Sequence, residues 1–543
     1  MLWDCIVVGG GLAGSSLSSR LLQYQPEANI LIVEAGRNVN NNPDIMYRNG
    51  STPRDLFWNM PTTPQRFLND RSVTIAVGTA LGGGTAVNGA NWVRGDRADY
   101  DSWADAVGDD SWSYDNLLPY MQRTEHFPHP LRNPGQHGYR GPVAAQTVSS
   151  TSRQYPLREQ VLESWNNIGF QSLPDLDANS GNPVGVADFC ENRANGRRQI
   201  ASVVYPLDGV TVLTETMVQK VLTTRQGETI RASGVRLANG TELQSRNVVV
   251  SAGALRTPQV LMLSGIGPAG VLQEHDIEVV VDAPEVGRSL MDHTIIDTQW
   301  RIREPGAGYA PGSGNPLFEE ERYGWGYPQD FMVSGTVSRQ GLIDNIAVDE
   351  GSAPDPETHP LLKHVDRTFL EYVLMYRGGA NDGSVVTLQS FLFTMSSRGT
   401  VTLGSSNVTD FPVIDPQYCS TATDRYIQRA GLRNLFKFAG SDLTPMGRDI
   451  LDGEITPEGQ QALRADMDDD ELNQRLFAGV RSALHPHGTA SMGTVVDRNL
   501  KVNGVDNLFV VDASVIPVPI AAHIQVAIYA LAERAAEILS NRV

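Results

Sequence analysis

The sequence has few cysteines, no long apolar run and a deficit of positive charge. Only three of its 543 residues are cysteine, and Cys5, Cys190 and Cys419 form no C-x-x-C pair. Neither a disulfide framework nor a zinc site is therefore expected. No uninterrupted apolar segment reaches the roughly 18 residues that a membrane-spanning helix needs. A formal net charge of −19 disfavours nucleic acids and anionic membranes as partners, because both would meet a repelling surface.

Apolar residues and glycine, by contrast, are abundant. Hydrophobic residues make up 41% of the chain, with 52 glycines and 31 prolines, which is typical of a large, loop-rich globular protein. The length is compatible with more than one domain. The first apolar run begins within a few residues of Met1 and leaves no room for a signal peptide. We therefore expect a soluble cytoplasmic protein if the chain is complete, and a secreted one if a signal peptide was removed.

The opening of the chain follows the pattern of a nucleotide-binding βαβ unit. Residues 5–8 are predicted to form a buried strand, and residues 9–14 follow at once with G-x-G-x-x-G spacing. A helix over 15–22 and a second strand over 30–33 lead to Glu34, about 20 residues after the glycines, where an acid that binds ribose belongs. Such a turn lets the backbone approach a pyrophosphate at a helix N-terminus. Glycine triplets also form purely structural turns, so the motif alone is weak.

Two further glycine-rich stretches carry a family resemblance. Residues 78–95 read G-T-A-L-G-G-G-T-A-V-N-G-A-N-W-V-R-G, and residues 253–267 read G-A-L-R-T-P-Q-V-L-M-L-S-G-I-G. They resemble the two signatures of the glucose-methanol-choline (GMC) flavin oxidoreductases, with one departure at Thr79, where the family usually has a basic residue. Residues 286–293, V-G-R-S-L-M-D-H, resemble another run of the family, with Ser289 in place of Asn. The resemblance extends over nearly the whole chain.

The resemblance implies an α/β fold with a Rossmann-like FAD-binding domain of GMC type and a second α+β substrate domain built on an antiparallel sheet. We expect residues 1–300 to form the FAD-binding domain, with some substrate-side loops, and residues 301–479 to form the substrate-binding domain. Residues 480–543 are expected to return to the FAD domain with the catalytic histidines. Residues 36–73 are rich in Asn, Pro and Arg and are expected to form a long loop.

The resemblance also implies FAD as the cofactor. Some family members attach FAD covalently through a histidine where this chain has Val87, so we expect FAD to be held without a covalent bond. Asp512 ends a predicted strand, and its family counterpart supports the linker of the flavin. The expected cofactor-binding residues are Gly9, Gly11, Leu12, Ala13, Gly14, Glu34, Ala35, Asn88, Gly89, Ala90, Asn91, Val218, Ala252, Asp512, Ala513 and Ile524.

The last sixty residues carry the expected catalytic groups. Residues 484–493, L-H-P-H-G-T-A-S-M-G, resemble the H-P-x-G-T run of the family and place His485 at the position of its catalytic histidine. The nearby His487 also suggests a metal site, but the segment lacks carboxylate or thiol ligands, so no metal is predicted. His523 is expected in the first turn of a helix over about 521–537, whose positive end would favour a neutral imidazole. His293 is expected to be a structural histidine.

Three functions are compatible with these residues. In the first, a small-molecule primary or secondary alcohol is oxidised: His485 takes the hydroxyl proton, His523 holds the same oxygen, and a hydride passes to the flavin. Oxygen or a quinone is then the expected electron acceptor. In the second, the same fold uses the histidine pair for lyase or cyclase chemistry without net oxidation. The third, a nicotinamide-dependent dehydrogenase, suits the opening unit alone and is disfavoured by the flavin signatures.

Overall fold

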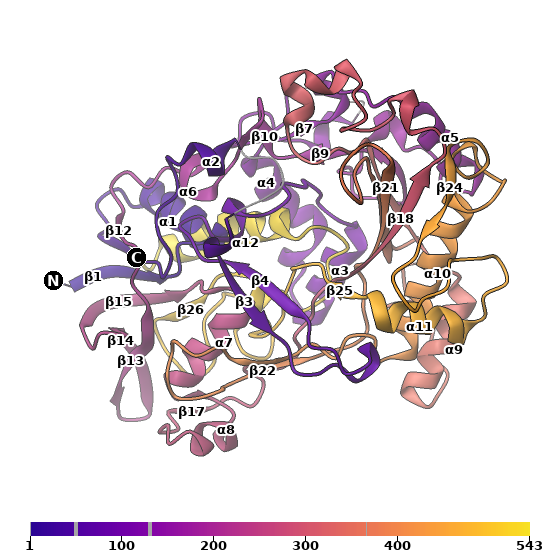
Figure 1. Ribbon diagram of the computed structural model, residues 1–543. Coiled ribbons are helices and arrows are strands. Elements are labelled where there is room, and N and C mark those ends of the chain that lie inside the picture. The colour runs from indigo at the N-terminus through magenta and orange to yellow at the C-terminus, as the bar shows by residue number, and fades with distance from the viewer. Residues whose placement is uncertain (1, 48–52, 129–132, 365) are drawn as a thin grey trace.

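The computed structural model describes residues 2–47, 53–128, 133–364 and 366–543. Two seven-stranded sheets organise these residues, with helices packed around them (Figure 1). Within the described ranges, no helix combines the length and the apolarity that crossing a bilayer requires. The longer helices besides those named below are α3 (Arg97–Val107), α4 (Tyr114–Thr124), α5 (Arg158–Asn167), α9 (Arg339–Glu350) and α11 (Asp469–Gly479), and shorter ones are α2 (Pro43–Met46), α6 (Ala201–Val204) and α8 (Ala269–Glu274).

The first sheet contains the predicted nucleotide-binding strands. β1 (Leu2–Val8) lies between β2 (Ile30–Val33) and β15 (Glu242–Val250) and is parallel to both. Every residue of β2 is buried, which is why the strand is a continuous apolar run instead of an alternating one. The remaining strands are β12 (Thr211–Leu213) beside β2, β26 (Leu508–Val510) and the antiparallel β14 (Thr229–Leu237) beside β15, and β13 (Val218–Gln226) beside β14.

Helix α1 (Leu12–Tyr24) follows the glycine turn directly. Gly9 has φ +100°, and a Cβ atom on Gly14 would lie 2.0 Å from the Gly9 carbonyl oxygen, so neither position accepts a side chain. The predicted strand, helix and second strand are confirmed. α1 packs against α12 (Gln525–Ser540), and Arg20 on α1 forms an ion pair of 2.8 Å with the buried Glu533 on α12. The last helix of the chain thus covers the first.

The second sheet is antiparallel throughout. Its strands run in the order β24 (Leu451–Ile455), β18 (Thr294–Ile302), β21 (Val385–Leu392), β20 (Leu370–Met375), β19 (Phe331–Gly335) and β8 (Gly185–Asp188), with the short β25 (Arg481–Ser482) also on β18. Helix α10 (Ala422–Ala439) packs on β21. The predicted antiparallel substrate sheet is confirmed.

The second sheet takes strands from both sides of the boundary expected at residue 300. That position lies inside β18, and β8 comes from residues 185–188, more than a hundred residues earlier. β25 falls after residue 479. The division of the chain into domains at residues 1–300, 301–479 and 480–543 remains a prediction. The second sheet takes strands from all three ranges.

Residues 36–73 are not one long loop, as expected from their composition. β3 (Phe57–Pro61) pairs antiparallel with β4 (Thr74–Gly78) and forms a hairpin, and the short helix α2 precedes it. Met60 on β3 and Ile75 on β4 are buried in one apolar cluster with Leu255 and Leu290, and this burial favours the pairing. Residues 48–52 lie outside the described residues. Trp58 and Val77 of this hairpin line the cavity described below.

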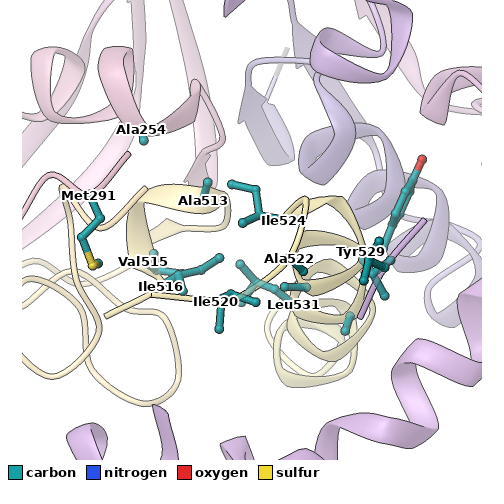
Figure 2. Packing of buried hydrophobic residues seen from close by; sticks show 14 of the residues in the cluster. Ala254, Met291, Ala513, Val515, Ile516, Ile520, Ala522, Ile524, Tyr529 and Leu531 are labelled. Carbon is teal, nitrogen blue, oxygen red and sulfur yellow. The ribbon is translucent and has the colours of Figure 1, made fainter. Parts of the chain in front are cut away.

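The segment before α12 is held by a dense apolar core. Val515, Ile516 and Ile520 are fully buried, and the same core includes Met291 from the start of the second sheet and Leu531 from α12 (Figure 2). Packing of this density leaves little freedom to the backbone between residues 513 and 531. The core therefore fixes the position of the His523 side chain relative to both sheets.

Candidate active site

A cavity of about 600 Å³ runs from the glycine turn to the two predicted catalytic histidines. At one end it is lined by Gly9, Gly11 and Glu34, and at the other by His485 and His523. Of the sixteen residues expected to bind the cofactor, Gly14 alone is not in the lining, because it packs α1 against the turn. The other fifteen line it: Gly9, Gly11, Leu12, Ala13, Glu34, Ala35, Asn88, Gly89, Ala90, Asn91, Val218, Ala252, Asp512, Ala513 and Ile524.

Glu34 lies at the end of β2 with both carboxylate oxygens engaged by backbone. Its Oε2 accepts a hydrogen bond of 2.7 Å from Gly10 N, and its Oε1 accepts one of 2.7 Å from Gly36 N. Burial raises the pKa of Glu34, and these two N–H donors oppose that rise. Each carboxylate oxygen retains acceptor capacity, so Glu34 can also bind a ribose hydroxyl from the cavity.

The glycine turn meets the first signature stretch without intervening side chains. Gly82 and Gly83 have φ of +92° and +53°, and a Cβ atom on Gly83 would lie 2.8 Å from the Gly11 Cα atom. Gly84, which also lines the cavity, faces open space. Close backbone with free N–H groups at the start of α1 is the arrangement that accepts a pyrophosphate.

Asp512 connects the end of the chain to the second signature. Its Oδ2 accepts hydrogen bonds from Gly253 N at 2.8 Å and from the Thr257 hydroxyl at 2.6 Å, both at the start of α7 (Gly253–Leu263). Its Oδ1 accepts from Ser514 N at 2.8 Å. Asp512 therefore holds two remote segments together beneath the middle of the cavity.

His485 lies on the loop after β25 and is held through its backbone and its ring. The backbone N–H donates to Asp292 Oδ1 at 2.9 Å, and the Asp292 Oδ2 atom accepts from the hydroxyls of Ser482 and Tyr418. The Nδ1 atom of His485 lies 3.0 Å from Nδ1 of His293. Burial, and then the neighbouring His523 and His487, hold the pKa of His485 well below its usual value, so the ring is neutral.

His523 faces His485 across the end of the cavity. The two ring centroids are 4.9 Å apart with the planes nearly perpendicular, which confirms that these remote histidines meet. Nε2 of His523 lies 2.9 Å from Glu371 Oε1 on β20 and 2.9 Å from the side-chain nitrogen of Asn91. The expected position in the first turn of a helix is wrong, because α12 begins at Gln525 and His523 precedes it.

Three residues around His485 and His523 make contacts that the sequence did not predict. His293 contacts the His485 ring, which is compatible with the expected structural role, and Asp292 fixes the His485 backbone. The D-H pair directly before β18 was the available signal. Glu371 was missed although it is a single acid in an apolar strand, where an unpaired carboxylate would be costly to bury. His487 is buried, and its Nδ1 donates to the His485 carbonyl oxygen at 2.9 Å.

Metal ligation has no support around this histidine cluster. In the part of the chain that the structure describes, no group of three or more His, Cys, Asp or Glu side chains is arranged to hold a metal ion. The Nδ1 atoms of His293 and His485 instead contact each other, and Nε2 of His523 contacts Glu371 and Asn91.

Two family models match the chain over most of its length. The GMC oxidoreductase N-terminal model covers residues 3–295, and the GMC oxidoreductase C-terminal model covers residues 396–532. The chain belongs to the GMC oxidoreductase family. Within it, the chain is 35% identical to the GMC-type oxidoreductase acuG of Aspergillus aculeatus over 545 residues, which covers 99% of each protein.

Other GMC relatives carry different names. The chain is 31% identical to pyridoxine 4-oxidase of Microbacterium luteolum, covering 98% of each protein. It is 30% identical to versicolorin B synthase of Aspergillus parasiticus, covering 99% of the chain and 88% of that protein. A solved structure of an Aspergillus oryzae formate oxidase with the R554A mutation, studied for its effect on FAD modification, superposes with a TM-score of 0.85 at 25% identity over 99% of the chain and 98% of that structure.

FAD is the cofactor of this GMC oxidoreductase, and the cavity suits it on physical grounds. Glu34 can bind the ribose of the adenosine half, the Gly11 and Gly83 backbone can hold the pyrophosphate, and the remaining length reaches the histidines. Val87 lines the cavity and has no atom able to form a covalent bond to a flavin. Attachment without a covalent bond stays a prediction, and FAD modification in that protein is a subject of the formate oxidase structure.

Proposed function

We propose that this GMC protein oxidises the CH–OH group of a small-molecule alcohol to a carbonyl group. The observation that supports the proposal is the pair of facing imidazoles, His485 and His523, at the end of the cavity opposite the nucleotide turn. When bound, FAD supplies the hydride acceptor. The alcohol loses a hydride and a proton, which together are two electrons and two hydrogens, and the chain must provide a base for the proton.

His485 is the base in this proposal. Its low pKa leaves it neutral, and of the two Nδ1 atoms of His485 and His293 one donates and the other accepts. When His485 Nδ1 donates to His293, the lone pair of His485 lies on Nε2, the nitrogen that can take the hydroxyl proton. His293 then acts as a positioning residue, because it sets the tautomer of the base.

His523 holds the substrate oxygen in the proposal. Glu371 Oε1 contacts Nε2 of His523, and Phe391 and Phe393 pack against its ring with centroid distances of 5.3 and 5.4 Å. These contacts fix the ring plane beside His485. A hydroxyl within hydrogen-bond reach of both imidazoles is therefore oriented before the proton and the hydride leave.

Replacing His485 with Ala tests the proposal directly. We expect anaerobic reduction of the flavin by alcohols to slow by about 10²–10⁴-fold, the usual contribution of a general base. The measurement is stopped-flow flavin absorbance with a panel of primary and secondary alcohols. His126→Ala is the matched control, because His126 is exposed and outside the cavity lining. An unchanged rate of flavin reduction in the His485 variant would show that His485 is not the base.

The electron acceptor in the second half-reaction is proposed to be oxygen or a quinone. Admitting air to the reduced protein distinguishes the two, because rapid return of the oxidised flavin spectrum requires reaction with oxygen. Slow return in air, together with fast return on adding a quinone, identifies a dehydrogenase.

A second candidate function is supported by the similarity to versicolorin B synthase, whose name is that of neither an oxidase nor a dehydrogenase. In this alternative, the histidine pair moves protons on the substrate without net oxidation, as lyase or cyclase members of the fold would. The two functions differ in one observable. If no alcohol bleaches the flavin while His485→Ala still abolishes conversion of a substrate, the non-redox function is correct.

A further inference from the structure

We propose that Gln329 and Arg377 form an anchor for a carboxylate on the substrate, so that the alcohol is one with an apolar body and an acidic group at its far end. The inference deepens the proposed function and rests on it for the position of the carbinol. It starts from the face that the second sheet presents to the cavity.

The side chains on that face differ with distance from His485 and His523. Alternate residues of a strand share a face, and the register places Glu371 opposite Phe391 and Val373 opposite Gln389. Phe391 contacts His523, whereas Met375 lies two positions beyond Val373 and roughly 13 Å along the strand from Glu371. Between the two ends the lining is mainly apolar, with Ile295, Val373, Met375 and Phe391, and its polar member Gln389 donates its amide to Asp297 at 2.7 Å.

Gln329 lies in the cavity lining at the Met375 end of this face. Only 2% of the residue is exposed, and its side-chain nitrogen has no hydrogen-bond partner among the described residues. A hydrogen bond of 2.7 Å from Tyr376 N to the Pro328 carbonyl oxygen ties this loop to the end of β20. A buried amide donor without an acceptor is costly unless a ligand supplies one.

Arg377 lines the same cavity and provides a positive charge there. Three arginines line the cavity, and two have acceptors: Arg256 donates to the Val408 and Asp410 carbonyl oxygens, and Arg481 forms an ion pair of 2.6 Å with Asp297. For the half-buried Arg377, the described residues provide no acceptor for the guanidinium. Its planar group lies over the Tyr327 ring, 4.7 Å from the ring centroid.

Tyr327 fixes the place of this guanidinium relative to the flavin end of the cavity. A Cβ atom on Gly89 would lie 2.7 Å from the Tyr327 ring, so the ring packs directly on the first signature stretch. Stacking on a ring leaves the edge of a guanidinium, with its N–H donors, free for a carboxylate. Gln329 and Arg377 together offer an amide donor and a charged donor, which suits an anionic oxygen pair better than a neutral hydroxyl.

The test measures binding to the FAD-loaded protein without turnover. We titrate 4-methylbenzoate and its neutral counterpart 4-methylbenzamide, and the two-ring 6-methyl-2-naphthoate with its amide, and follow the flavin absorbance. In the one-ring pair, the two-ring pair or both, we expect the carboxylate to bind at least ~10-fold more tightly than the amide. This is the effect of a hydrogen bond to a charged group. If the carboxylate and the amide bind with equal affinity in both pairs, the proposal is overturned. That result is expected if water alone satisfies the donors of Gln329 and Arg377.

Variants separate the two members of the anchor. Arg377→Met is expected to abolish the preference for the carboxylate, whereas Gln329→Leu weakens both ligands, because its amide donates to either carbonyl oxygen. Arg301→Met, on the exposed part of β18, is the matched control and keeps the wild-type preference. A preference that survives Arg377→Met in a variant with full FAD content overturns the assignment of Arg377.

The corresponding alcohols separate this proposal from the proposed function. With 4-(hydroxymethyl)benzoate and its amide, kcat/KM for flavin reduction should show the same preference as binding, and Arg377→Met should remove it. If the carboxylates bind with the predicted preference but no alcohol reduces the flavin, the anchor stands and alcohol oxidation is wrong. If alcohols reduce the flavin with no preference for the acid, oxidation stands and the anchor is wrong.

Discussion

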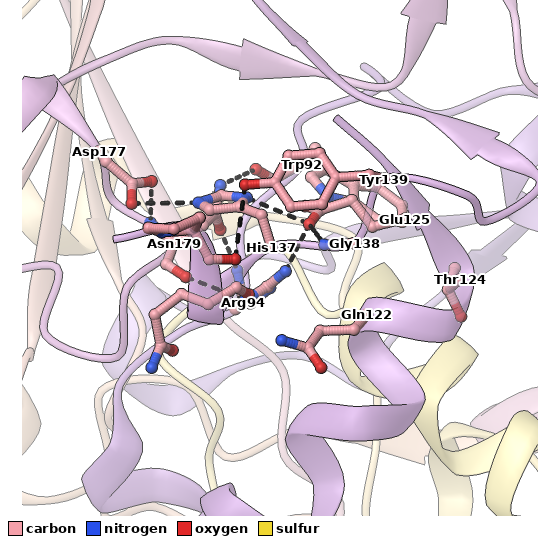
Figure 3. A network of polar contacts seen from close by, with 12 residues as sticks. Trp92, Arg94, Gln122, Thr124, Glu125, His137, Gly138, Tyr139, Asp177 and Asn179 are labelled. Atoms are coloured by element: carbon pink, nitrogen blue, oxygen red, sulfur yellow. Dashed lines mark hydrogen bonds and ion pairs between the residues drawn. The ribbon is translucent and has the colours of Figure 1, made fainter. Parts of the chain in front are cut away.

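Two groups of buried side chains in this protein hold a histidine in different charge states, a cation in the first and a neutral ring in the second. In the first, His137 lies between two carboxylates, with Nδ1 3.1 Å from Glu125 Oε2 and Nε2 3.2 Å from Asp177 Oδ2 (Figure 3). Burial lowers the pKa of His137, but the hydrogen bonds to Asp177 and Glu125 outweigh it and the net pKa is raised. A ring with an acceptor-only group at each nitrogen must donate from both, so His137 is a cation.

In the second group, the carboxylate lies beside the backbone and not beside the ring. Asp292 accepts from the His485 backbone N–H, while the ring nitrogen Nδ1 faces another imidazole, His293. Burial therefore lowers the pKa of His485 with no acid to oppose it. Burial alone therefore does not decide whether a histidine is a cation or a neutral base. The position of the nearest carboxylate relative to the ring decides it.

The largest expected effect is the loss of Glu125 from the first group. Glu125 accepts from the fully buried Arg94 at 2.5 Å, from Trp92 Nε1 at 2.8 Å and from Gly138 N at 2.9 Å. Glu125→Ala leaves the buried Arg94 cation with carbonyl acceptors but without its ion-pair partner, which we expect to lower the free energy of unfolding by about 3–5 kcal/mol. Urea unfolding of the FAD-loaded protein measures this. Glu242→Ala, which breaks an exposed pair with Arg236, is the control and should cost about 1 kcal/mol or less.

His293→Asp should place a carboxylate beside the His485 ring, as Glu125 lies beside the His137 ring in the first group. The new carboxylate oxygen takes the place of the His293 Nδ1 atom beside the His485 ring and raises the pKa of that ring. We expect the pH of half-maximal flavin reduction to rise by roughly one unit or more relative to His293→Asn, the neutral variant of the same shape. Stopped-flow reduction across a pH series measures both. Coincident profiles would mean that position 293 does not govern the charge of His485.

A smaller effect is expected from the protonation of His137 itself. Because its folded-state pKa is raised, its contribution to stability is complete below the unfolded value of about 6.5 and is lost as pH rises through the folded value. The excess stability of the wild type over His137→Gln should therefore shrink as pH increases above neutrality. Urea midpoints at several pH values measure it. An excess that grows with pH would show that His137 is neutral.

The smallest expected change is in the wild-type reaction near neutral pH. Since the pKa of His485 lies well below its usual value, the base stays unprotonated as pH falls from about 8 to about 6. The limiting rate of anaerobic flavin reduction should then be constant over that range, with loss only at more acidic pH. A decline centred near pH 6.5 would show instead that His485 titrates like an exposed histidine.

The sequence predicted the elements whose contacts are local and left out those whose contacts are remote. The βαβ unit follows from apolar runs and glycine spacing within 35 residues, and it was correct. Glu371 and His523 are 152 residues apart, and only the folded second sheet brings them to 2.9 Å. The hairpin of β3 and β4 was missed because its strands are only five residues long and the residues that cover them, such as Leu255 and Leu290, are remote in the sequence.

The placement of the histidines was predicted by resemblance and not by periodicity. Nothing in the local pattern around His485 says that its ring faces His523, since the loop after β25 has no regular repeat. The start of α12 was misplaced by a few residues, because Ala521 and Ala522 favour a helix while tertiary packing holds them in an irregular segment. Helix ends depend on such packing more than on propensity.

The strand β26 has a consequence for biosynthesis. It pairs with β15 beside the nucleotide turn, and α12, which follows it, covers α1, so a segment that is translated late completes a sheet whose first strands are translated early. Until residues 508–540 emerge, Asp512 and the lining from residue 512 onward are missing from the cofactor site. A nascent chain arrested before β26 therefore cannot assemble the complete cofactor site, and the full set of contacts to FAD forms only once this segment has been translated.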